Sequence, residues 1–284
     1  MHCQEHPRPL APKKRSRCSP ALPVRDPVPP PARRPHSRSG GPALHRPSLS
    51  GQRRANRVKQ EAPVTPEIKQ IAQSVLEVLR LLHRDGMVHT DVKLDNIFVN
   101  HSTGGNQRFS DIQLGNCGGV VSQESSFAKD GHIIGGAFTR GPEATLQLPW
   151  GTATEIWSFG TAMLSLVFGG GYHLFNPKID NVGPERADYE LTALKRMHRF
   201  FGPFPESYQD FKEEDIMTIV NFINAQGPPP KPFHRVGPRE VPAADMDFLL
   251  KLLKLDPRDR PTAEALLADA WFAEESQDTR DPLP

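Results

Sequence analysis

The sequence predicts an α+β fold that is mostly helical and carries one short β-hairpin, within residues 64–274. Three patterns support this prediction. Apolar residues recur at helical spacing over 68–82, alternate as in a strand over 112–114, and surround a complete helix over 154–168. Together they indicate a helical domain with a small hairpin inserted after its first helix.

Residues 1–63 differ in composition from the rest of the chain. Residues 1–60 contain 14 Lys and Arg against 2 Asp and Glu, together with 12 of the 30 prolines. A segment so charged and so poor in apolar residues buries too little surface to offset its ordering entropy. We therefore predict disordered segments at 1–63 and 275–284, and we expect any contact with nucleic acid to involve only the basic tail over 1–60.

Cysteine usage and hydropathy restrict the compartment. Cys3, Cys18 and Cys117 are unevenly spaced and form no paired motif, which indicates neither a disulfide framework nor a zinc site. The N-terminus lacks the apolar core of a signal peptide, and no run approaches the roughly 20 apolar residues of a membrane span. We therefore expect an intracellular protein, in the cytoplasm or the nucleus, without a membrane segment.

The first elements follow from local signals. The first helix is predicted to have Thr65 as its N-cap and Pro66 at the first helical position, and to end at Gly86. Its apolar residues form one continuous stripe. A strand at 97–99 and a second arm at 112–114 then form the hairpin.

The remainder of the domain is predicted to be mainly helical. Residues 119–139 are polar and rich in glycine, a composition that is typical of a mobile segment. An apolar helix over 154–168 suits the centre of a domain, and an amphipathic helix follows over 191–201. Two closing helices are predicted over 246–255 and 263–272.

The loop between the first helix and the hairpin carries a compact polar pattern. Asp91, Lys93 and Asn96 lie in it, between the apolar residues Val88 and Ile97. Phosphoryl transfer to a hydroxyl needs such a set, because a carboxylate accepts the proton, a cation neutralises the transferred group and an amide oxygen helps to hold Mg²⁺. The same spacing is also typical of a turn rich in helix-capping residues, so the flanking motifs decide between the two interpretations.

The order of the motifs resembles the eukaryotic protein kinase family of serine/threonine type. His89–Asn96 is similar to the catalytic loop H-R-D-x-x-x-x-N, with Thr90 in place of the Arg. Thr139–Glu143 resembles Tyr-Arg-Ala-Pro-Glu, in the form found in the CMGC-like branch of cyclin-dependent and MAP kinases. Leu255–Thr262 is similar to the closing Asp-x-x-x-Arg-Pro-Thr segment. The resemblance covers 64–274 and implies a protein-kinase-like fold, of which this is the mostly α-helical C-terminal lobe.

The resemblance also implies a role for each candidate site residue. The catalytic roles fall on Asp91, Lys93 and Asn96. Nucleotide contacts fall on Phe98, Asn96 and Asn116, and weak Mg²⁺ ligation falls on Asn96 and Asn116. Structural roles fall on His89, Glu143, Glu155 and Arg260, with Glu143 expected to pair with Arg260. The implied cofactors are ATP and Mg²⁺ if the protein is active and none otherwise, and the implied partner is a protein substrate or a docked protein.

Several departures from the family pattern concern catalysis. Asn116 stands where the family has the Mg²⁺-binding Asp of Asp-Phe-Gly, since the alternative triplet at 110–112 lacks the glycine and breaks the strand register. An amide holds Mg²⁺ less well than a carboxylate. Gly136 replaces a Thr that bonds the catalytic Asp. Residues 1–63 contain no G-x-G-x-x-G and no Lys in an apolar strand, so we expect the N-terminal β-lobe to be missing.

Three hypotheses follow from this pattern. The first is a serine/threonine protein-kinase-like domain that transfers the ATP γ-phosphate to hydroxyls but is impaired, because the glycine-rich loop, the strand Lys and the Asp of Asp-Phe-Gly are absent. The second is a catalytically dead pseudokinase that works as a scaffold, with the helix over 191–201 among its docking surfaces. The third is a truncated gene model of an active kinase, in which 1–63 replaces a real small lobe.

Overall fold

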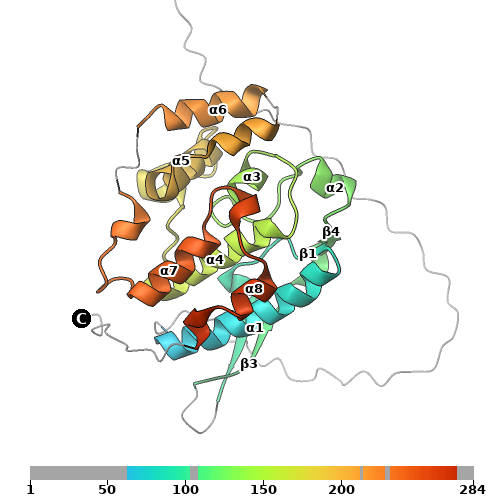
Figure 1. The fold of residues 1–284 in the computed structure, drawn as a ribbon, viewed down its shortest axis with the longest axis vertical. Coiled ribbons are helices and arrows are strands. Elements are labelled where there is room, and N and C mark those ends of the chain that lie inside the picture. The colour runs from blue at the N-terminus through green and yellow to red at the C-terminus, as the bar shows by residue number, and fades with distance from the viewer. Residues whose placement is uncertain (1–62, 103–107, 212–213, 228–230, 274–284) are drawn as a thin grey trace, which may run out of the picture. The chain divides into compact units, whose positions relative to one another are not determined.

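The computed structural model describes residues 63–102, 108–211, 214–227 and 231–273, and these residues form a mainly helical fold (Figure 1). The predicted disordered segments, apart from residue 63, lie outside the described residues. The helices are α1 (Thr65–Arg84), α2 (Ser126–Lys129), α3 (Pro142–Thr145), α4 (Ala153–Phe168), α5 (Tyr189–Phe201), α6 (Glu214–Asn224), α7 (Ala243–Leu252) and α8 (Ala263–Leu267). The strands are β1 (Met87–Val88), β2 (Ile97–His101), β3 (Phe109–Leu114) and β4 (Val121–Ser122).

Helix α1 begins one residue away from where the sequence places it. Val64 is the N-cap, and its backbone N–H donates to the carboxylate of Glu67 at 2.9 Å. The prediction of Thr65 as N-cap is therefore wrong, because a carboxylate inside the first turn satisfies the free N–H instead. Gly86 follows the helix with φ 65°, as expected for the residue that ends it.

The predicted hairpin is formed by β2 and β3, which pair antiparallel with Ile97 opposite Leu114. The ladder shifts register between Phe98 and Asn100, so the outer part of β2 twists away from the inner part. A second two-stranded sheet pairs β1 with β4 and brings Val121 opposite Val88. Strands of two residues are too short to show an alternating pattern, so the sequence did not predict this second sheet.

Helix α4 occupies the centre of the domain, with α1 and α7 packed against it (Figure 1). Trp157 and most of its neighbours on this helix are fully buried. A Cβ added at Gly160 would lie 2.9 Å from Leu253 Cδ2 and 3.0 Å from Leu252 Cβ, so glycine allows the C-terminal end of α7 to approach α4 closely. Among the described residues, no helix is long and apolar enough to cross a membrane.

The segment over 119–139, whose composition is typical of a mobile segment, contains regular structure. It includes β4 and α2, and Ser125 caps α2 by accepting a hydrogen bond from the Ala128 N–H at 3.3 Å. The indole N–H of Trp150 donates to the His132 carbonyl at 2.7 Å. These contacts join the segment to the rest of the domain near the catalytic loop.

Candidate active site

The polar loop between β1 and β2 brings the three predicted catalytic side chains together. The carboxylate oxygen Oδ2 of Asp91 accepts a hydrogen bond from Asn96 Nδ2 at 2.9 Å, and Lys93 Nζ lies 2.9 Å from the same oxygen. Asn96 Nδ2 also donates to the Asp91 carbonyl at 2.6 Å. Asn96 is 6 % exposed, because it ends a short 3-10 helix (Leu94–Asn96) that turns the chain into β2.

The other carboxylate oxygen of Asp91 has a different environment. Within the described part of the chain, no side chain or backbone group donates a hydrogen bond to Oδ1. The Asp91 side chain is 24 % exposed, so this oxygen is accessible from outside. A carboxylate held on one oxygen and open on the other is suited to accept a proton from a bound hydroxyl.

His89 fixes the backbone on which Asp91 lies. The ring is fully buried, its Nδ1 accepts a hydrogen bond from the Asp91 N–H at 3.3 Å, and its Nε2 lies 3.0 Å from the Gly115 carbonyl. Because Nδ1 accepts, Nε2 carries the proton and donates to Gly115. Gly115 N–H in turn donates to the Asn96 carbonyl at 2.8 Å, so the imidazole ties the loop to the end of β3.

Thr90 lies in a strained conformation that a buried carboxylate supports. Its φ is 73°, a region that β-branched residues rarely adopt. Its N–H donates to Glu155 Oε1 at 2.9 Å, and its hydroxyl donates to the Gly119 carbonyl at 3.1 Å. Glu155 is 1 % exposed on α4. The Glu155 side chain therefore reaches the catalytic loop from α4.

Sequence reasoning missed one residue of this support, His83. Its Nε2 lies 2.9 Å from Glu155 Oε2, and its side chain is 11 % exposed at the C-terminal end of α1. Glu155 thus accepts hydrogen bonds from α1 and from the catalytic loop with its two oxygens. The partners are 72 residues apart, and a His in the last turn of a helix has an adequate local explanation in the helix dipole, so the sequence carried no signal for this contact.

Asn116 faces the same cluster from the end of β3. It adopts φ 65°, a left-handed conformation that Asn tolerates well, and its Nδ2 lies 3.4 Å from both Asp91 Oδ2 and Asn96 Oδ1. Asp111, in the alternative triplet, lies out on β3, where its carboxylate accepts hydrogen bonds from Asn100 and Gln113. The geometry is therefore consistent with the assignment of Asn116.

The donor set of this cluster does not fit a tightly bound Mg²⁺. Asp91 is the single carboxylate that the described residues place there, and Lys93 lies 2.9 Å from it. Asn116 directs its Nδ2 toward the neighbours with which it would share a metal. Among the described residues, no group of three or more His, Cys, Asp and Glu is arranged to hold a metal ion. Mg²⁺ prefers carboxylate oxygens and water, so the two amides alone provide a poor site.

Phe98 lies where a planar ligand could rest on the hairpin. The side chain is 37 % exposed on β2. A Cβ added at Gly115 would lie 2.4 Å from Phe98 Cε2, so the ring packs directly on the glycine backbone. Glycine at 115 is thus required for the position of the ring, one residue before Asn116.

At Gly136 the structure shows no replacement for the missing Thr side chain. The Gly136 N–H donates to Thr139 Oγ1 at 3.2 Å, and this hydroxyl donates back to the Gly136 carbonyl at 3.1 Å. The turn is closed on itself and sends no hydrogen bond to Asp91.

Glu143 and Arg260 form a buried ion pair behind the site. Arg260 Nη1 and Nη2 donate to the two Glu143 oxygens at 2.6 and 2.9 Å, and both side chains are at most 1 % exposed. Arg260 also donates to the carbonyls of Ala153, Lys254 and Leu255, and it lies over the Trp157 ring. Every guanidinium nitrogen therefore has an acceptor, which favours a buried pair.

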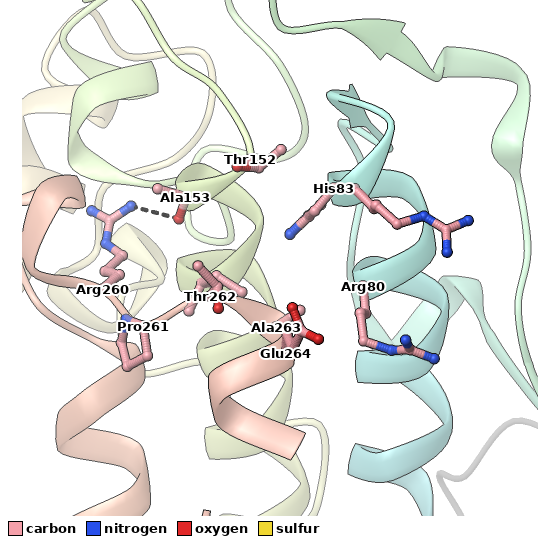
Figure 2. Close-up of a pocket in the computed structure, with 11 residues that line it drawn as sticks. Arg80, His83, Thr152, Ala153, Arg260, Pro261, Thr262, Ala263 and Glu264 are labelled. Atoms are coloured by element: carbon pink, nitrogen blue, oxygen red, sulfur yellow. Dashed lines mark hydrogen bonds between the residues drawn. The ribbon is translucent and has the colours of Figure 1, made fainter. Parts of the chain in front are cut away.

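A cavity of about 260 Å³ lies on the far side of His83, between α1, the start of α4 and the start of α8. Figure 2 shows His83 on α1 directed toward the opposite wall of the cavity, with Arg260 bonded to the Ala153 carbonyl. None of the residues predicted to act in catalysis lines this cavity. The Asp91 cluster instead lies at a partly exposed edge of the domain.

Comparisons with known proteins agree with this arrangement. The family model of the protein kinase domain matches residues 48–272. The chain is 28 % identical over 232 residues to the serine/threonine-protein kinase US3 homolog of varicella-zoster virus (strain Dumas), covering 80 % of this chain and 54 % of that protein. It is 28 % identical over 206 residues to the serine/threonine-protein kinase PAK mbt of Drosophila melanogaster, covering 72 % of this chain and 25 % of that protein.

A crystal structure of a kinase domain matches with a TM-score of 0.54 at 18 % identity, covering 75 % of this chain and 67 % of that chain, which supports the fold. The chain spans about half the length of the viral relative. The predicted kinase-like, mostly helical fold is therefore confirmed. Because the family model covers well over half of the sequence, the chain belongs to the protein kinase family.

Proposed function

We propose that this chain carries a phosphoryl-transfer site of the serine/threonine kinase type whose activity is impaired. The observation that supports this most is the two-sided environment of Asp91. Lys93, Asn96 and Asn116 all approach its Oδ2, whereas Oδ1 has no donor among the described residues. Glu143 differs, since both of its oxygens accept hydrogen bonds from Arg260.

In this proposal each residue has a defined step. Asp91 Oδ1 accepts the proton of a substrate Ser or Thr hydroxyl while the hydroxyl oxygen bonds to the γ-phosphorus of ATP. The bond from the γ-phosphorus to the bridging oxygen breaks, and ADP leaves. Lys93 neutralises charge on the transferred group, and Phe98 forms part of the floor under the adenine. None of these steps involves Mg²⁺, since the donor set of the cluster does not fit a tightly bound ion.

The proposed impairment has two grounds: the amide of Asn116 in place of a carboxylate, and the lack of a lobe that covers the phosphates. The amide replaces a charge that the family uses for Mg²⁺. We further propose that the described residues correspond to the C-terminal lobe alone, and that residues 1–62 do not replace the phosphate-covering lobe, since they contain no G-x-G-x-x-G. The Arg within Thr139–Glu143 supports the proposal that the chain belongs to the CMGC-like branch.

The second candidate function is that of a pseudokinase scaffold. It is favoured by the hydrogen bonds of Asn116, whose Nδ2 approaches Asp91 Oδ2 and Asn96 Oδ1 at 3.4 Å. In such an arrangement the amide groups bond to one another and to Asp91. In this case Asp91 contributes nothing to the biological role.

Transfer of labelled phosphate from ATP separates the two candidates. The full chain is assayed beside Asp91→Asn and Asn116→Asp, with nucleotide binding measured in parallel. An impaired enzyme gives low transfer that Asp91→Asn lowers by roughly 10²–10⁴-fold. Asn116→Asp restores the metal carboxylate, and Asp tolerates φ 65°, so this variant raises both Mg²⁺-dependent binding and transfer. Absence of transfer and of nucleotide binding in all three proteins supports the scaffold and overturns the enzyme.

A further inference from the structure

A second cavity, of about 380 Å³, lies beside α5 and involves no residue of the catalytic loop. Its volume falls within the range of roughly 300–1,000 Å³ that is usual for ligand sites. Figure 1 shows α5 and α6 side by side at one end of the domain. The cavity is lined chiefly by polar side chains, among them Asp180, Thr192, Lys195, Arg196, His198 and Arg199.

The charges around this cavity are unbalanced. Arg196 Nη1 donates to Asp180 Oδ2 at 2.8 Å, and Arg199 Nη1 donates to Asp180 Oδ1 at 3.4 Å. Lys195 forms no ion pair with the described residues and instead lies over the ring of Phe222. The lining thus contains three cationic side chains and one carboxylate, Asp180, which pairs with Arg196 and Arg199, while Lys195 interacts electrostatically with Asp188 outside the lining. The excess positive charge favours an anion in the cavity.

Two buried side chains in the wall have donors or acceptors to spare. Arg196 is 3 % exposed and uses Nε and Nη1, while its Nη2 has no acceptor among the described residues and remains open to solvent. His198 is 4 % exposed, and its buried Nε2 has no partner among the described residues. Buried polar atoms without a partner are costly and uncommon in native structures. The wall therefore contains one free cationic donor and one buried polar atom that gain from a ligand or an ordered water.

Two exposed apolar side chains neighbour residues that line the cavity. Phe222 on α6 is 46 % exposed, and Ile179, next to Asp180, is 48 % exposed. A free inorganic ion would gain nothing from these side chains. A peptide that carries an anionic group could cover them with its neighbouring residues, which adds apolar burial to the charge attraction.

We propose that this cavity binds the phosphate group of a phosphorylated serine or threonine in a partner protein, with the partner's neighbouring apolar residues on Phe222 and Ile179. A phosphate monoester carries close to two negative charges and three acceptor oxygens, which match the excess charge and the free donor of Arg196. Because no catalytic residue is involved, the site goes beyond the proposed phosphoryl transfer and does not depend on it.

Fluorescence anisotropy with the full chain tests this site. The probe is a labelled peptide of about eight residues with one phosphoserine between leucines, and it is compared with its unphosphorylated form, its Glu form and inorganic phosphate. The test variant is Lys195→Gln with Arg199→Gln. The control is Arg80→Gln with Arg84→Gln, which removes two cations at the same helical spacing from α1. Circular dichroism establishes that both double variants are folded.

We expect the test variant to weaken binding of the phosphopeptide by at least about tenfold, since the loss of each charge-assisted hydrogen bond lowers the binding affinity. The control variant should change it by less than about twofold. Equal weakening in both variants would overturn the site, as would absence of phosphopeptide binding to the unmodified chain. Binding of the Glu peptide as tight as that of the phosphopeptide would overturn the specificity for phosphate. Inorganic phosphate that binds as tightly as the peptide would overturn the partner protein as its source.

Discussion

Asp91 and Glu143 are both carboxylates next to a cation, but their surroundings differ. Glu143 is 1 % exposed, and both of its oxygens accept hydrogen bonds from Arg260. Asp91 is 24 % exposed, and only its Oδ2 has donors among the described residues. The satisfied pair joins α3 to the segment before α8 and leaves nothing for a ligand. Asp91 instead keeps one oxygen available, and this difference supports the catalytic role proposed for it.

The largest expected effect comes from breaking the buried pair. Glu143→Gln leaves the positive charge of Arg260 buried without its counter-charge, and we expect the free energy of unfolding to fall by about 3–5 kcal/mol. Urea denaturation measures this loss. Asp188→Asn is the control, because it removes a carboxylate from the exposed pair with Arg186 and should leave the free energy of unfolding nearly unchanged. Equal losses in the two variants would contradict the contrast drawn here.

A second effect, intermediate in size, concerns acid. The hydrogen bonds from Arg258 lower the pKa of Asp256 from its usual range to about 2, and the Ser207 hydroxyl also donates to this carboxylate. Since the folded pKa lies below the unfolded one, the stabilisation is present above about pH 4 and is lost as the pH falls toward 2. We expect the full chain to exceed Asp256→Asn in unfolding free energy by about 2 kcal/mol at pH 6.

Denaturation curves of these two proteins at several pH values test the linkage. Their difference should shrink steadily between pH 4 and pH 2, because protonated Asp256 and Asn are similar in charge. A difference that stays constant over this range would show that Asp256 acts through its shape and hydrogen bonds alone, and that its charge stabilises nothing.

The smallest expected effect on stability belongs to Asp91→Asn. Removing this charge leaves Lys93 at a position that is 32 % exposed, so water can replace the lost partner. We expect the free energy of unfolding to change by less than about 0.5 kcal/mol, measured by the same urea denaturation. A loss near that of Glu143→Gln would place Asp91 among the structural residues and remove the main support for a catalytic role.

The sequence predicted the fold well where the signals are local. Apolar spacing identified α1 and α4, and the turn at Gly86 was placed correctly. The loop of Asp91, Lys93 and Asn96 was found because these residues lie within six positions of one another between two buried anchors. The contact between Glu143 and Arg260, 117 residues apart, was expected only through the resemblance to a family and from no local pattern.

The errors and omissions have two physical causes. Helix boundaries depend on backbone hydrogen bonds formed elsewhere, and contacts between distant residues leave no local pattern. Helix α7 begins at Ala243, three residues earlier than predicted, and α8 ends at Leu267, after which the chain continues in a short 3-10 helix. Such boundaries depend on which free backbone groups find partners elsewhere, as at Val64. The bond between His83 and Glu155 was missed because each residue has an adequate local explanation.

By itself, the sequence predicted the helical class and the polar loop of Asp91, Lys93 and Asn96, because these signals lie in neighbouring residues. Only the tertiary structure decided that Asp91 Oδ1 has no donor among the described residues, that Glu155 supports Thr90 at φ 73°, and that Arg196 and Arg199 of α5 share Asp180. These properties depend on distances between segments far apart in the chain. Such distances are set by packing of the whole core and have no local signature.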